Sequence, residues 1–229
     1  MTIRHSLFTG RTSVILVGNP GVGKSTILNA LGGDFHTGFS AVSGLTRDVS
    51  TTNVTTSNGD KLRLIDIPGI FDCQVDDDRA TERHLEILRQ TLNDGGSYVI
   101  FFVITPRNGR IDPSDFAVMK TLLDNLEESP VVGLILNQVK RHHYDNIQSS
   151  DYFAKIERVL RDAGANLKFF NKKKPLILLD HPEEFNQAEN RAILNYVLSF
   201  QPACVYVHRL VSSFLRRMYE LIIAIVCAA

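Results

Sequence analysis

The stretch that decides the fold is GNPGVGKSTILNALGG, residues 18–33, in which glycines, a proline and a lysine precede a helical pattern. The run before it, TSVILV at 12–17, is apolar and β-branched, which predicts a buried strand. Strand, glycine-rich loop and helix is the context in which Gly-x-x-x-x-Gly-Lys-Ser forms a phosphate-binding loop, or P-loop. Backbone N–H groups of such a loop enclose phosphate oxygens at the positive end of the helix dipole. The sequence therefore predicts a nucleotide site.

Within this motif each polar residue has an expected task. Lys24 should reach the β- and γ-phosphates as a point charge, and the Ser25 hydroxyl should ligate a Mg²⁺ ion that bridges them. A glycine-rich turn without a ligand would leave the spacing of this lysine and serine unexplained. The residues predicted to contact the nucleotide here are Gly18, Asn19, Pro20, Gly21, Val22, Gly23, Lys24, Ser25 and Thr26.

A second motif, Asp66-Ile67-Pro68-Gly69, follows the strand-like run KLRLI. An aspartate at this point can hold the magnesium ion, and the Gly69 N–H can donate to the γ-phosphate. Turns after strands often contain Asp, Pro and Gly, so the motif gains its weight from the P-loop ahead of it. Between the two motifs, Thr46 is expected to complete the magnesium shell. The loop 34–48 would then be a switch that triphosphate orders and hydrolysis releases.

The composition bounds the class of protein. The chain has 229 residues, is 44% hydrophobic and carries 25 basic and 25 acidic residues, which suits one well-buried core and predicts no nucleic-acid partner. Its three cysteines have no paired or metal-type spacing, which suits a reducing compartment, and the N-terminus lacks the apolar run of a signal peptide. We therefore expect a cytoplasmic protein. The cysteines are Cys73, Cys204 and Cys227.

Strand-like and helix-like segments alternate along the chain. Residues 97–104, SYVIFFVI, form a continuous apolar run of the kind found in buried parallel strands. The alternation predicts an α/β domain of the doubly wound type, with a mostly parallel sheet covered by helices on both faces. Thr105 and Asn137 then fall at the same sheet edge as the P-loop, where ligands bind. Strands are expected at 12–17, within 48–66 on either side of Asn58-Gly59, and at 97–104, 131–137 and 175–180. Helices are expected after Lys24 and over about 79–93, 113–127, 150–163 and 187–200.

The C-terminal residues 221–229, LIIAIVCAA, are apolar but too few to span a bilayer. We expect a nucleotide-binding domain over 1–202 and a helical extension over 203–229 that packs on it. A helix lying at a membrane or against a partner is the alternative.

Four segments together resemble the immunity-associated GTPases, the avirulence-induced-gene type of septin-like G protein: the P-loop, the threonine in its Gly/Ser-rich loop, LIDIPGIFD at 64–72 and GRIDPSD at 109–115. The resemblance covers about residues 12–140. It implies a three-layer Ras-like G domain, Mg²⁺-dependent binding of GTP and GDP, slow hydrolysis, and a nucleotide-dependent homodimer formed through the nucleotide face. It also implies that Arg110 acts in trans across that dimer, and a protein effector is a further expected partner. A surface arginine that pairs locally is the other interpretation of Arg110, and Arg107 and Arg47 are rival donors.

Two departures from the family pattern leave alternatives open. GTPases read guanine with Asn-Lys-x-Asp, whereas this chain has Asn137-Gln138-Val139-Lys140, so guanine preference should be narrower unless another acceptor replaces the lost carboxylate. Ile70 stands where Ras-like enzymes have the glutamine that orients water, which predicts slow intrinsic hydrolysis. The alternatives to a GTPase switch are a P-loop ATPase or phosphotransferase, and a nucleotide-binding scaffold without turnover. Candidate base contacts are Asp145, His142, His143, Asp180 and His181.

Overall fold

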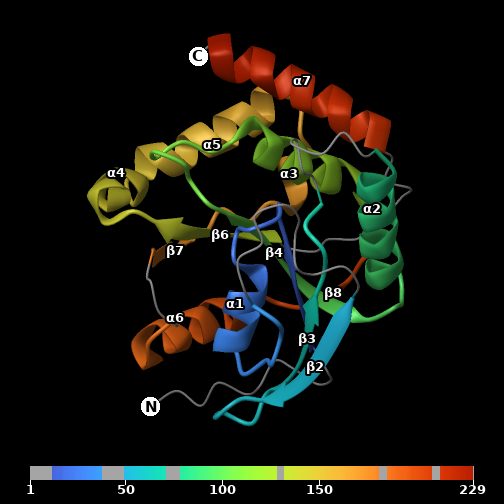
Figure 1. Ribbon diagram of the computed structural model, residues 1–229, viewed down its shortest axis with the longest axis vertical. Coiled ribbons are helices and arrows are strands. Elements are labelled where there is room, and N and C mark those ends of the chain that lie inside the picture. The colour runs from blue at the N-terminus through green and yellow to red at the C-terminus, as the bar shows by residue number, and fades with distance from the viewer. Residues whose placement is uncertain are drawn as a thin grey trace.

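A mixed β-sheet forms the centre of the molecule (Figure 1). This computed structural model describes residues 12–37, 49–70, 78–127, 132–180, 185–207 and 212–228. The strand order is β2-β3-β1-β4-β6-β7, in which β2 runs antiparallel to β3 and the neighbours after β3 are parallel, while β8 pairs antiparallel with the start of β4. The strands are β1 (Thr12–Val17), β2 (Ser50–Thr55), β3 (Lys61–Asp66), β4 (Ser97–Ile104), β6 (Val132–Val139), β7 (Leu176–Leu179) and β8 (Ala203–Cys204).

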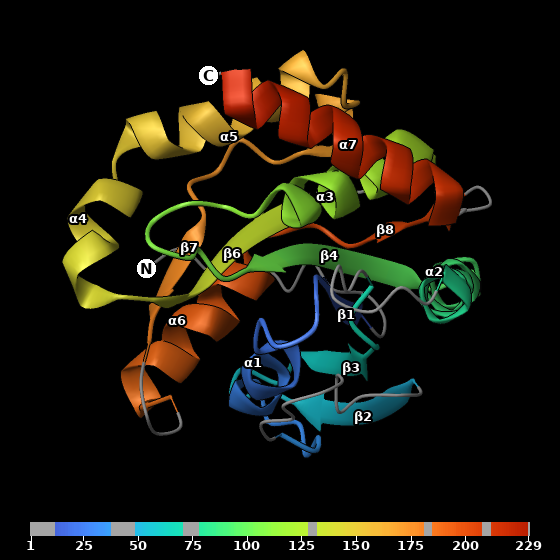
Figure 2. The ribbon, with the colours of Figure 1, turned by 45° about the horizontal axis from the view of Figure 1, so that its top comes forward.

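Helices cover both faces of this sheet, as the alternating sequence pattern predicts (Figure 2). Because side chains alternate along a strand, Val14 and Leu16 of β1 pack toward α1 and α6, whereas Ile15 and Val17 pack toward α2, α3 and α5. The three-layer α/β fold expected from the sequence is therefore confirmed. The helices are α1 (Lys24–Ala30), α2 (Asp78–Leu92), α3 (Pro113–Asn125), α4 (Tyr144–Ile147), α5 (Ser150–Asp162), α6 (Gln187–Leu198) and α7 (Ser212–Ala228).

Several boundaries differ from the sequence prediction. The helix expected over 113–127 ends at Asn125, because the next two residues form the short strand β5 (Leu126–Glu127), which pairs with β9 (Tyr206–Val207). Between the strand expected at 131–137 and the helix expected at 150–163, the structure has a 3-10 turn (Arg141–His143) and the single-turn α4. Short elements of this kind have too few residues for a periodic pattern, so only tertiary pairing reveals them.

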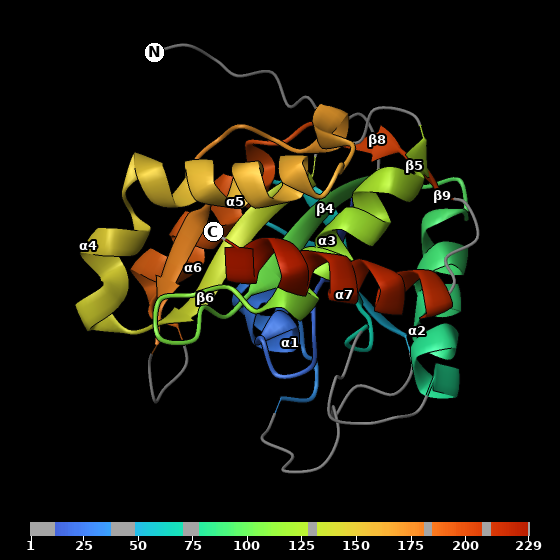
Figure 3. The same cartoon turned by 90° about the horizontal axis from the view of Figure 1, so that it is seen from above.

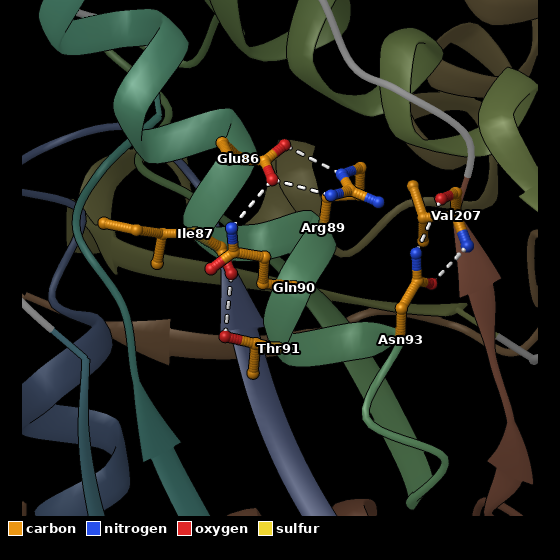
Figure 4. Close-up of polar contacts among 7 residues, drawn as sticks. All are labelled: Glu86, Ile87, Arg89, Gln90, Thr91, Asn93 and Val207. Carbon is orange, nitrogen blue, oxygen red and sulfur yellow. Dashed lines mark hydrogen bonds and ion pairs between the residues drawn. The ribbon is translucent and has the colours of Figure 1, made fainter.

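The end of α2 is tied to the chain that leads to α7 (Figure 4). The Asn93 side chain donates from Nδ2 to the Val207 carbonyl at 2.9 Å and accepts from the Val207 N–H at 2.7 Å. Two turns earlier, Glu86 receives two hydrogen bonds from the Arg89 guanidinium and a third from Gln90. Side-chain hydrogen bonds within the helix therefore stabilise this end of α2, and the Asn93 bonds fix it to β9.

The C-terminal helix α7 lies across α3, with further contacts to α2 and α5 (Figure 3). Ile222 is fully buried in the larger core cluster, whereas Leu221 and Ile223 remain 40% and 36% exposed. The helix therefore packs on the domain through one face. Within the described residues, no helix combines the length and the apolar character needed to cross a bilayer.

Candidate nucleotide-binding site

The P-loop connects β1 to α1, as the motif requires, and its backbone needs glycine. Gly23, immediately before α1, has φ 85°, and a Cβ atom added there would lie 2.4 Å from Nδ2 of Asn137. Asn137 donates from Nδ2 to the Val22 carbonyl at 2.9 Å, so a side chain at position 23 would collide with the amide that holds the loop in place. The glycine spacing of the motif is thus a requirement of close packing as well as of φ.

Lys24 opens α1 and is 7% exposed. Its Nζ donates to the carbonyls of Gly18 at 3.2 Å and Asn19 at 3.1 Å, so the ammonium lies inside the curve of the loop. Burial lowers the pKa of Lys24 to about 8, and the charges of Asp66 and Asp115 oppose this shift. The lysine is still a cation at neutral pH, which is the state that phosphate requires.

Ser25 and Asp66 lie together beside this lysine. The Ser25 hydroxyl donates to Asp66 Oδ2 at 2.7 Å, and Asp66 is 2% exposed at the end of β3. A hydroxyl and a carboxylate are hard oxygen donors, which fit Mg²⁺ when nucleotide oxygens and water supply the other ligands. The described residues contain no cluster of three or more His, Cys, Asp or Glu that could hold a metal without such help. Thr46, the third expected ligand, lies outside the described residues.

The Asp66–Gly69 turn packs directly on the P-loop. A Cβ atom on Gly69 would lie 2.4 Å from the Pro20 nitrogen, and the Ile70 N–H donates to the Gly18 carbonyl at 3.3 Å. His84 of α2 forms a hydrogen bond with the Gly69 backbone. Partial burial lowers the pKa of His84, and the nearby cations Arg83 and Lys24 lower it further, whereas the hydrogen bond to Gly69 raises it. His84 was not among the predicted site residues, because a lone histidine inside an amphipathic helix carries no local signal.

On the side where the base is expected, β6 continues past its predicted end at Asn137 to Val139. Gln138 adopts φ 56° at an irregularity in the β6–β7 register, and its side chain donates to the Gly21 carbonyl at 3.2 Å and accepts from Thr105 at 3.2 Å. The structure thus brings the ends of β1, β4 and β6 together, as the sequence predicts. The Asn137 and Gln138 side chains, at the end of β6, both donate hydrogen bonds to carbonyl groups of the P-loop.

Lys140 takes the place of the guanine-reading aspartate and forms an ion pair with Asp180 at the end of β7. The pair is partly exposed, and the Asp180 N–H donates to the Val139 carbonyl at 3.0 Å. A carboxylate is therefore present near the end of β6 although the motif itself lacks one. Of the other candidate base contacts, His142 and His143 lie on the 3-10 turn with ring centroids 4.1 Å apart, Asp145 is exposed on α4, and His181 lies outside the described residues.

Arg110 lies on a tight hairpin between β4 and α3. Arg107 and Arg110 exchange backbone hydrogen bonds of 2.8 and 2.9 Å, and Asn108 and Gly109 both have positive φ, the geometry of a type I′ turn. The Arg107 and Arg110 side chains are exposed. The structure therefore keeps Arg110 at the surface of the sheet edge that carries the P-loop and does not bring it onto Lys24. Arg47 lies outside the described residues.

The beginning of α3 also contacts the P-loop. Asn19 donates from Nδ2 to Asp115 Oδ1 at 2.8 Å and to Ser114 Oγ at 3.0 Å. Burial, reinforced by the charge of Asp112, raises the pKa of Asp115 to about 7. Asp115 had no role among the sequence predictions, although it is the final residue of GRIDPSD (109–115), the GRxxxxD element on which the family resemblance partly rests.

A glycine loop around a buried lysine, a serine–aspartate pair beside it and a central sheet flanked by helices define a Ras-like P-loop GTPase domain. The sequence profile of the 50S ribosome-binding GTPase family matches residues 13–138, more than half of the chain, and the chain belongs to this family.

Known relatives agree with this assignment. Immune-associated nucleotide-binding protein 3 of Arabidopsis thaliana is 30% identical over 118 residues, which are 51% of this chain and 34% of that protein. The resemblance to the immunity-associated GTPases is thereby confirmed. The chain spans about a third of the length of the curated relatives it matches first.

Solved structures with this fold include Toc33 and Era. Toc33 of Arabidopsis thaliana, solved as a dimerization-deficient mutant, superposes with a TM-score of 0.51 at 15% identity, covering 91% of this chain and 86% of Toc33. Era of Aquifex aeolicus bound to GDP·AlF4⁻ superposes with a TM-score of 0.52 at 22% identity, covering 85% of this chain and 57% of that one. At these identities the likeness extends to the fold alone.

Proposed function

We propose that this chain binds GTP and GDP with Mg²⁺, hydrolyses GTP slowly and acts as a switch that self-associates through its nucleotide face. The observation that carries the proposal is the buried Lys24 ammonium inside the P-loop, with Ser25 and Asp66 joined at 2.7 Å beside it. In this proposal Lys24 binds the β- and γ-phosphate oxygens, and Ser25 and Asp66 hold the ion. The bound Mg²⁺ would neutralise phosphate charge.

Slow hydrolysis rests on the residue after Gly69. Ile70 is 2% exposed and apolar, so it offers no side-chain group to orient an attacking water. Within this proposal, the Gly69 N–H donates to the γ-phosphate and an arginine from a second copy supplies the missing charge. Arg110 suits that role because it is exposed on a defined hairpin at the sheet edge of the P-loop. Toc33 was solved as a dimerization-deficient mutant, so a protein of this fold does dimerise.

Titration calorimetry with GTP, GDP and ATP in Mg²⁺ tests the binding part of the proposal. Lys24→Ala and Ser25→Asn should abolish tight triphosphate binding, and Lys155→Ala, at an exposed lysine of α5, should not change it. Unchanged affinity in both P-loop variants would refute the site. Binding of ATP without GTP would favour a P-loop ATPase or phosphotransferase instead.

Turnover measured over a series of protein concentrations tests self-association. If Arg110 acts in trans, turnover per molecule should rise with concentration, and Arg110→Ala should remove that rise while leaving GTP affinity nearly intact. Arginines of this kind contribute ~10³- to 10⁵-fold in known GTPases. Turnover that is independent of concentration, or a full rise in the variant, would return Arg110 to a surface role. Nucleotide binding with no phosphate release at any concentration would favour the scaffold alternative.

A further inference from the structure

A continuous set of buried contacts connects the first turn of α3 to the phosphate-binding lysine. Asp115 accepts a hydrogen bond from the Asn19 amide at 2.8 Å, and the Asn19 carbonyl accepts from Lys24 Nζ at 3.1 Å. Asn19 is 8% exposed and Asp115 is 6% exposed, so neither contact is replaced easily by water. One P-loop residue thus joins α3 through its side chain and Lys24 through its backbone.

Asp115 is itself held in place by the cap of α3. Asp112 is the N-cap residue, and its Oδ1 accepts from the Ser114 N–H at 2.9 Å and from the Ser114 hydroxyl at 2.7 Å. The Asp115 N–H donates to the Asp112 carbonyl at 3.0 Å, and Pro113 fixes the first helical position. The acceptor that meets Asn19 is therefore part of a rigid helix start rather than of a loose loop.

We propose that Asp115 is a positioning residue for the P-loop, which holds Asn19, and through the Asn19 carbonyl Lys24, in the arrangement that receives the terminal phosphate of the nucleotide. This inference rests on the proposed function. The inference assigns a role to Asp115, the last residue of the GRxxxxD element. Without Asp115, the Asn19 amide keeps Ser114 as an acceptor at 3.0 Å but loses the stronger acceptor, and the loop gains freedom next to Lys24.

The charge of Asp115 gives this role a signature that a merely structural contact lacks. Burial and the nearby Asp112 raise the pKa of Asp115 to about 7, while the Asn19 hydrogen bond and Arg107 oppose the shift. Lys24, which also interacts with Asp66, senses the Asp115 charge. A bound phosphate adds negative charge and favours the protonated carboxyl, so nucleotide binding should take up a proton. Affinity should then fall as pH rises through 7, by at most tenfold per pH unit.

The test is titration of Mg²⁺–GTP into the full chain between pH 6 and 8, in buffers of different ionisation enthalpy. Asp115→Ala should weaken binding by about 2- to 10-fold, the range for losing a hydrogen bond whose acceptor is neutral when nucleotide is bound. Asp115→Asn keeps an acceptor for Asn19 without charge, so it should retain affinity and take up less proton. Its pH profile should be flatter than that of the parent and keep only the dependence that comes from Lys24, whose pKa is about 8. The matched control is Asp162→Asn, at an exposed aspartate at the end of α5, which should behave as the parent.

The outcomes separate this inference from the proposed function. If Lys24→Ala retains tight binding, the nucleotide site itself is wrong. If Lys24→Ala loses binding but Asp115→Ala binds like the parent, only the role of Asp115 is wrong. If Asp115→Ala does not fold, Asp115→Asn decides: a pH profile and proton uptake equal to those of the parent would overturn the inference, and a flattened profile with retained affinity would support it.

Discussion

Replacing Lys24 with methionine should stabilise the nucleotide-free chain while abolishing triphosphate binding. Lys24 is 7% exposed, and burial lowers its pKa from 10.5 to about 8 despite two carbonyl acceptors and two nearby carboxylates. Each pKa unit corresponds to roughly 1.4 kcal/mol, so keeping the ammonium charged in the folded chain costs about 3 kcal/mol. Methionine has a similar length and no charge, so it removes this cost.

The pH dependence follows from the sign of the shift. The pKa of Lys24 is lower in the folded chain than in the unfolded chain, so the destabilisation is complete below pH 8, where both states carry the proton. It is lost as pH rises toward 10.5, where both states are neutral. The advantage of Lys24→Met should therefore be about 3 kcal/mol at pH 7 and fall to about 1 kcal/mol at pH 10.

Urea unfolding of the parent and Lys24→Met without nucleotide measures this difference, and fluorescence titration with triphosphate measures the loss of binding. Lys155→Met changes an exposed lysine on α5 and should shift stability by no more than about 0.5 kcal/mol. If Lys24→Met is less stable than the parent at pH 7, or if the difference does not shrink toward pH 10, the reasoning from a buried, desolvated ammonium is refuted.

Three further substitutions test other contacts. His84→Ala removes the bond to the Gly69 backbone and should slow single-turnover phosphate release by about 2- to 10-fold at unchanged GTP affinity; equal rates would exclude a role for His84. Asp180→Asn neutralises the carboxylate paired with Lys140 and should reduce the ratio of GTP to ATP affinity by about tenfold, and an unchanged ratio would place base recognition elsewhere. Tyr98→Phe removes a buried hydroxyl that donates to backbone and carboxylate oxygens and should lower the free energy of unfolding by about 1–2 kcal/mol, measured by urea at an unchanged m-value.

Much of the fold was predictable because its signals are local. The β-branched run of β1, the glycine spacing before Lys24 and the apolar run of β4 each identify an element from a few adjacent residues. Parallel strands order their carboxyl ends along one edge, so the meeting of Gly18, Asp66 and Asn137 follows from the pattern alone. Ser25 and Asp66 are 41 positions apart in the sequence and still meet at 2.7 Å.

The rest depends on tertiary contacts without a local pattern. The positive φ of Gln138 arises where β6 changes register against β7, and a glutamine gives no warning of it. Asp115 in a first helical turn suggests an ordinary helix start, and only packing against Asn19 makes it part of the site. Thr46 lies outside the described residues, so its assignment as a magnesium ligand stays a prediction.

The two hydrogen bonds between Asn93 and Val207 connect the end of α2 to β9. His84 ties α2 to the peptide of Gly69, and Asn93, just beyond the end of the same helix, holds the chain that continues into α7. A slide of α2 along its axis by a single residue rise, about 1.5 Å, would break both Asn93 bonds. A shift of α2 that follows the Asp66–Gly69 turn would therefore also break the hydrogen bonds that hold β9.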